Sequence, residues 1–152
     1  MNSNSFENID GKGLRFAIVG SRFNQNLCDA MVDDAKAALL NCGVSPEQIK
    51  IVRVPGSFEL PVAANQLAAT DLYDAVICLG VLIKGETKHD QYIASAVAHG
   101  LTDVSTQFGI PVAFGVLTTE TKEQAEARAL GAQKKGWEAA MSAVETVRAL
   151  KG

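Results

Sequence analysis

Hydrophobic residues in this 152-residue chain gather in short runs, and segments with apolar positions at helical spacing follow each run. The continuous runs predict buried strands, which are expected at 14–20, 49–54, 73–83 and 111–117. The spacings of three and four predict helices at 27–42, 58–69, 93–108, 118–129 and 136–150. The predicted order is therefore βαβαβαβ followed by two helices.

Repeated βα units predict a parallel sheet with right-handed crossovers and helices on both faces. The third run, Ala75 to Ile83, is the most continuously apolar, so we expect it to be a central strand. Residues 1–13 are expected to form a flexible lead-in, and 14–152 a single domain. Ligands of such sheets bind beyond the carboxyl ends of the strands. The segments to search are therefore 20–26, 54–60, 80–90 and 114–121.

Composition narrows the class of protein. A net charge of −3 gives no overall attraction to nucleic acid or to an anionic membrane, so neither is expected as a partner. The polar N-terminus does not have the pattern of a signal peptide, and the longest apolar run is too short to span a bilayer, which favours a cytoplasmic protein. The three cysteines, Cys28, Cys42 and Cys78, have no CxxC spacing. We expect buried reduced thiols rather than disulfides or a zinc site.

The segments after the first two runs carry an aromatic ring and a carboxylate. Phe23 stands in the polar stretch 21–26, so its ring either stacks on a flat ligand or folds back on the core. Ser57 is a candidate helix N-cap. Glu59 either stabilises the first helical turn through the helix dipole or accepts hydrogen bonds from ligand hydroxyls.

The segments after the last two runs carry phosphate- and proton-binding groups. The backbone amides near Gly85, before a helix start, suit a phosphate, although the segment is neither a Walker motif nor GxGxxG. His89 follows the expected central strand, where a proton carrier is useful at neutral pH, whereas His99 is expected to be a surface or packing residue within a helix. Thr121 and Gln124 have capping-box spacing, and Arg128 either binds a phosphate or stabilises a helix C-terminus. These residues indicate an α/β enzyme with one histidine, a phosphate site and rings for a flat ligand.

Taken together, the segments resemble the lumazine synthase family over about residues 14–150. The matching motifs, in the family's order, are SRFN at 21–24, PGSFELP at 55–61, GVLIKGETKHDQYI at 80–93, PVAFGVLTTET at 111–121, EQAEAR at 123–128 and KGWEAA at 135–140. The resemblance implies a flavodoxin-like three-layer α/β/α sandwich around a four-stranded parallel sheet. It also implies an enzyme that condenses 5-amino-6-(D-ribitylamino)uracil with 3,4-dihydroxy-2-butanone 4-phosphate to give 6,7-dimethyl-8-ribityllumazine, in the penultimate step of riboflavin biosynthesis, without a metal or an organic cofactor.

The resemblance assigns roles to individual residues. His89 would be the catalytic proton carrier. The ribitylaminouracil would be held by Phe23, Asn24, Ser57, Phe58, Glu59, Val81, Leu82, Ile83, Phe114 and Lys135. The phosphate of the second substrate would be held by the amides of Glu86 and Thr87 and by Arg128. Phe114 and Arg128 would come from a neighbouring subunit, which would place the active sites between subunits.

The family is built on pentamers, and some members assemble twelve pentamers into a hollow 60-mer icosahedral shell. The sequence leaves open whether riboflavin synthase is a partner enclosed by such a shell. Residues 130–136, LGAQKKG, are one residue shorter than the turn GTKAGNKG of shell-forming members, which leaves pentamer and shell both open. A flavin- or lumazine-binding module, a shell scaffold and a flavodoxin-type electron carrier are the alternatives. Product formation, particle size and bound FMN respectively would distinguish them.

Overall fold

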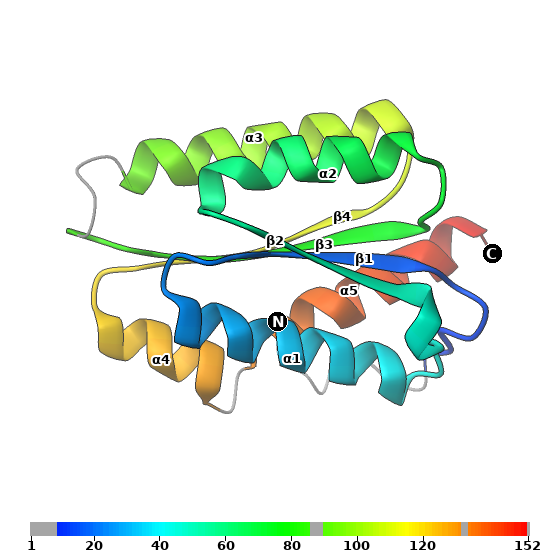
Figure 1. Ribbon diagram of the computed structural model, residues 1–152, viewed down its shortest axis with the longest axis horizontal. Helices are drawn as coiled ribbons and strands as arrows, with labels where there is room; N and C mark the ends of the chain where they lie inside the picture. The colour runs from blue at the N-terminus through cyan, green and yellow to red at the C-terminus, as the bar shows by residue number, and fades with distance from the viewer. Residues whose placement is uncertain (1–8, 86–89, 132–133, 152) are drawn as a thin grey trace.

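The computed structural model describes residues 9–85, 90–131 and 134–151. A parallel sheet of four strands lies between two layers of helices (Figure 1). The strands are β1 (Phe16–Ser21), β2 (Ile49–Val54), β3 (Ala75–Ile83) and β4 (Val112–Thr119). The α-helices are α1 (Gln25–Asn41), α2 (Leu60–Ala69), α3 (Asp90–Phe108), α4 (Lys122–Leu130) and α5 (Lys135–Lys151), and two 3-10 turns are η2 (Pro46–Gln48) and η3 (Ser57–Glu59). The three-layer α/β fold is confirmed.

The strand order is β2-β1-β3-β4, so the chain moves from β1 to one side and then returns to the other. This order puts a switch point between β1 and β3, which is where ligands of such sheets bind. β3 is an inner strand and all nine of its residues are buried, as its apolar run predicted. All four carboxyl ends meet at one end of the sheet, at the left of Figure 1, where α1, α2 and α3 begin.

Each face of the sheet has its own core because successive side chains of a strand point to opposite sides. Phe16, Ile18 and Ile77 pack with α1 and α5 on one face. Val19 and Cys78 pack with α2 and α3 on the other. Figure 1 shows the two layers, with α1, α4 and α5 below the sheet and α2 and α3 above it.

Two local predictions were wrong. The helix expected at 118–129 begins only at Lys122, because β4 pairs with β3 as far as Thr119↔Ile83. Thr121 then caps α4 by accepting a hydrogen bond from the Gln124 amide at 3.1 Å. Ser57 is not an N-cap: η3 begins after Gly56, and Ser57 is buried instead.

The cysteines are free thiols, although only two of them are fully buried. Burial raises the pKa of Cys78 to about 12, and it also raises the pKa of Cys28. Cys42 is half-buried rather than buried, because it lies at the exposed C-terminal end of α1, where its thiol donates to the Leu39 carbonyl. Across the described ranges, no His, Cys, Asp and Glu side chains gather in a group of three that would hold a metal ion. No helix of these ranges is long and apolar enough to cross a membrane.

Asp74 anchors the C-terminal helix at the end of the sheet far from the carboxyl ends. Its carboxylate accepts the Arg15 amide at 2.7 Å and lies 2.9 Å from Lys151 Nζ. Burial alone would raise the pKa of this carboxyl, but the Arg15 amide, the Lys151 ammonium and the Arg15 guanidinium together hold the pKa below its usual value. The ionised carboxylate therefore favours the folded state.

We expect Asp74→Asn to lower the free energy of unfolding at pH 7 by about 1 kcal/mol, the size of one hydrogen bond to a charged group in a partly exposed pair. The depressed pKa means that the wild-type advantage exists above the unfolded pKa of about 4 and is lost as the pH falls through the folded pKa. Urea unfolding followed by Trp137 fluorescence at pH 7 and about pH 3 measures this. A difference that is the same at both pH values would contradict the role of the charge.

Candidate functional site

The loop after β1 is fixed at the carboxyl edge by backbone and side-chain hydrogen bonds. The amides of Arg22 and Phe23 donate to the carbonyls of Val54 and Pro55 at 2.7 and 3.0 Å. Asn24 adopts a left-handed conformation (φ 62°), which asparagine tolerates better than most residues. This conformation turns the chain into α1 and leaves Phe23 beside the end of β2.

Asn24 also bridges the switch point. Its Nδ2 donates to the Val81 carbonyl at 3.0 Å. The pairing of β1 with β3 ends at Gly20↔Leu79, whereas the pairing of β3 with β4 continues to Ile83↔Thr119. The backbone at 80–83 therefore has a strand partner on one side only. Its other side faces the Phe23 loop, which suits the polar edge of a flat ligand.

The turn after β2 brings its carboxylate and hydroxyl to the same edge. Glu59 Oε1 accepts the Gly56 amide at 2.9 Å, so one carboxylate oxygen closes the turn. This contact supports the structural interpretation of Glu59 and leaves the second carboxylate oxygen for a ligand. The Ser57 hydroxyl packs against Gly80 of β3, where a Cβ would overlap it.

These segments form one shallow pocket of about 290 Å³. Its lining consists of Phe23, Pro55, Gly56, Ser57, Phe58, Glu59 and Leu82. Five of the residues predicted to hold ribitylaminouracil are therefore brought together from the ends of three strands. The Phe23 ring is 48% exposed, so it covers the pocket rather than folding into the core. Phe58 is 63% exposed, which is a high value for an aromatic ring beside a pocket.

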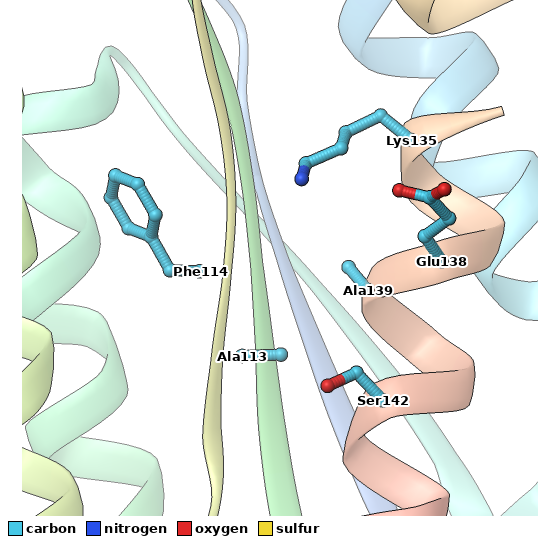
Figure 2. Close-up of a pocket in the computed structure, with 6 residues that line it drawn as sticks. All are labelled: Ala113, Phe114, Lys135, Glu138, Ala139 and Ser142. Carbon is cyan, nitrogen blue, oxygen red and sulfur yellow. The ribbon is translucent and has the colours of Figure 1, made fainter. Parts of the chain in front are cut away.

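A second pocket, of about 130 Å³, lies between β4 and α5. Its lining consists of Ala113, Phe114, Lys135, Glu138, Ala139 and Ser142. Figure 2 shows the Lys135 ammonium reaching from α5 toward the strands, beside the Glu138 carboxylate. The Phe114 ring points to the opposite face of the sheet. Phe114 lies on β4, an edge strand, and Lys135 on α5, and neither lines the Phe23 pocket.

Glu138 is a residue that the sequence interpretation missed. It is only 9% exposed, and its Oε1 has no hydrogen-bond partner in the part of the chain that the structure describes. A buried carboxylate oxygen without a partner is costly. The signal in the sequence is the spacing of Lys135, Glu138 and Ser142, which places three polar groups on one side of the helix.

The remaining predicted residues are placed as follows. Arg128 is exposed in the last turn of α4, where its charge suits the helix dipole, and His99 is exposed on the surface of α3. Val81, Leu82 and Ile83 are buried, so only their backbone groups are suited to a ligand. Glu86, Thr87 and His89 lie outside the described residues.

Comparison with known proteins identifies the family of the chain. The family model for 6,7-dimethyl-8-ribityllumazine synthase matches residues 13–151. A protein of that name from Syntrophus aciditrophicus is 47% identical over 141 residues, 92% of each chain. Another from Aquifex aeolicus is 49% identical over 145 residues, 94% of each chain. A match of this extent covers both pockets and every strand of the sheet, and the chain therefore belongs to the 6,7-dimethyl-8-ribityllumazine synthase family of enzymes.

Proposed function

We propose that this enzyme condenses 5-amino-6-(D-ribitylamino)uracil with 3,4-dihydroxy-2-butanone 4-phosphate, giving 6,7-dimethyl-8-ribityllumazine, phosphate and water. The observation that carries the proposal is the pocket that joins the ends of β1, β2 and β3, since it combines an exposed ring, a carboxylate and one-sided strand backbone. A flat, polyhydroxylated heterocycle needs all three. The family match gives the reaction.

The first pocket would hold the pyrimidine. Phe23 stacks on the ring, the backbone at 81–83 meets its polar edge, and Asn24 keeps that backbone in place through the Val81 carbonyl. The free carboxylate oxygen of Glu59 accepts hydrogen bonds from ribityl hydroxyls. The backbone of Ser57 and Phe58 borders the ribityl chain of the substrate.

The second pocket would be completed by another copy of the chain. Phe114 closes the ring pocket of the neighbour, and Lys135 and Glu138 offer a donor and an acceptor to its ribityl chain. A ribityl hydroxyl would also give Glu138 Oε1 a hydrogen-bond partner, which this oxygen does not have among the described residues of its own chain. Arg128 of the same copy pairs with the phosphate as a bidentate donor.

The two proposed parts of the site lie at opposite edges of the sheet, and this arrangement favours a ring of subunits. Phe58 follows β2, at one edge of the sheet, and Phe114 lies on β4, at the other edge. Contacts between unlike surfaces of identical chains are heterologous, and such contacts close into rings when the rotation permits. We propose the pentamer that the family resemblance implies, with one site at each contact.

The reaction would need neither a metal nor an organic cofactor. The aromatic amine is already a nucleophile and the ketone an electrophile, so the protein has to bring them together and move protons. We expect full activity after dialysis against EDTA. The functional test is to mix the purified protein with both substrates and follow the absorbance and fluorescence of the lumazine above the uncatalysed rate. No product from an intact oligomer would reject the proposal and favour a binding module.

His89→Ala is expected to lower kcat only about tenfold, less than the roughly 100-fold that a positioned proton carrier usually contributes, because bringing the two substrates together supplies most of the rate. Positioning of the two substrates persists without the imidazole, so KM values should change little. Steady-state kinetics measure kcat and both KM values of the variant, and light scattering checks that its oligomer is intact. A complete loss of turnover in an intact oligomer would show that His89 does more than carry a proton.

A further inference from the structure

We propose that Arg53 is a positioning residue, which holds the Phe23 loop in its ligand-binding position together with Asp29. The identity of the ligand that the loop binds rests on the proposed function. The contacts of Arg53 with the ends of the loop, called the clamp below, are a property of the chain itself. Arg53 does not line the pocket, so it acts through the loop and not on the substrate.

The clamp joins three elements at the carboxyl edge. Arg53 comes from β2, and its Nε and Nη2 donate to the carbonyls of Gly20 and Ser21 at 3.2 and 3.1 Å. These are the last two carbonyls of β1 before the loop. Its Nη1 lies 2.6 Å from Asp29 Oδ1 on α1, just after the loop. One guanidinium therefore fixes both ends of the segment that carries Phe23.

The local sequence makes room for this side chain. A Cβ on Gly20 would lie 3.1 Å from Arg53 Nε and 2.6 Å from a methyl group of Val32, so only glycine leaves the path across β1 open. The planar guanidinium supplies several donors in a fixed geometry, which a lysine does not. Arg53 therefore makes two hydrogen bonds and one close ion pair at once, and its side chain is only 29% exposed.

The other side-chain contacts between the loop, β1 and α1 are weaker. The Cys28 thiol donates to the Phe23 carbonyl at 3.3 Å and lies 3.3 Å from the Ser21 hydroxyl. Thiols are weak donors and acceptors. The backbone bonds of Arg22 and Phe23 go to the end of β2, the strand that also carries Arg53. Loss of the guanidinium would thus loosen the loop from the end of β1 and from α1, while its backbone bonds to the end of β2 and the bond from Asn24 Nδ2 to the Val81 carbonyl of β3 would remain.

The test compares Arg53→Gln with Arg53→Lys and Asp29→Asn. We expect Arg53→Gln to raise the KM for ribitylaminouracil about three- to tenfold, with kcat and the KM for the phosphorylated ketone within about twofold of wild type. Asp29→Asn should change the same KM in the same direction by less. Arg53→Lys should restore part of the loss, because the ammonium still reaches Asp29 as a point charge.

A measurement made without substrate tests the position of the loop independently of the reaction. In Arg53→Gln, amide hydrogen exchange over 20–28 should become faster, while exchange over 75–79 in β3 should stay unchanged. Arg15→Gln is the matched control, because its guanidinium makes an ion pair with Asp74 at the other end of the sheet. It should alter neither the KM nor exchange over 20–28.

Unchanged exchange and an unchanged pyrimidine KM in Arg53→Gln would overturn the proposal. Equal rises in both KM values in Arg53→Gln would assign Arg53 a general structural role and overturn the proposal as well. If the wild-type protein formed no product, the proposed function would fail. Amide hydrogen exchange over residues 20–28 in Arg53→Gln would still show whether Arg53 holds the loop.

Discussion

Refolded mixtures of Phe23→Glu and Arg128→Glu subunits should recover about one quarter of wild-type activity, although each variant alone is nearly inactive. The two residues belong to different groups of the proposed site. In an equal random mixture, about half of the copies carry an intact Phe23 and about half carry an intact Arg128. A site that takes Phe23 from one copy and Arg128 from its neighbour is therefore intact in about one case in four.

Each variant alone should lose about 100-fold in kcat/KM or more. Glutamate at 23 would remove the proposed stacking ring, and glutamate at 128 would replace the proposed phosphate-binding charge with a repulsive one. Losing about 2.7 kcal/mol of charge-assisted binding corresponds to that factor. Both side chains are exposed, so neither change should disturb folding.

The mixture is prepared by unfolding both variants in urea, combining them in equal amounts and refolding, with wild type and each single variant treated in the same way. Activity is measured as initial rates of lumazine formation, with the uncatalysed rate subtracted. Mixing folded variants without urea controls for subunit exchange. Activity that stays at the single-variant level in a mixture with the wild-type oligomer size would contradict a site between subunits.

Gly80→Ala should reduce kcat/KM by about 100-fold while leaving most of the protein folded. A Cβ at this position would overlap the Ser57 hydroxyl and lie 3.4 Å from the Ser21 hydroxyl. Both neighbours are buried, so Ser57 must move and carry the Phe58–Glu59 turn with it. Overpacking of this kind costs about 1–3 kcal/mol in stability, and small misplacements of binding groups cost about 100-fold in rate.

Gly11→Ala is the matched control for this variant. Its Cβ would lie 2.7 Å from a Val44 methyl carbon and 2.9 Å from the Cys42 sulfur, in a crowded place away from the carboxyl edge. We expect a comparable loss of unfolding free energy with kcat/KM near wild type. Equal losses of activity in both variants would mean that Gly80 acts through stability alone.

Much of the fold was predictable because its signals are local. The run at 49–54 matches β2 in both bounds, and the apolar continuity of 75–83 identified an inner strand. The end of β4 was not predictable, since Thr118 and Thr119 are as acceptable at a helix start as in a strand. Pairing with Leu82 and Ile83 of β3 decided it. Ser57 was misassigned as a cap for a similar reason, because its burial depends on Gly80, which is distant in sequence.

The sequence by itself determined the α/β class, the segments that meet at the carboxyl edge of the sheet and the motifs that carry the family resemblance. These follow from periodicity, from strand ends and from residue types in order along the chain. The tertiary structure alone decided that Phe23 and Leu82 share a pocket with Ser57–Glu59 and that Phe114 and Lys135 line another. It also decided that Glu138 is buried without a partner among the described residues and that Arg53 spans β1 and α1. Such contacts join residues far apart in sequence, and their geometry depends on strand order and register, which no local pattern encodes.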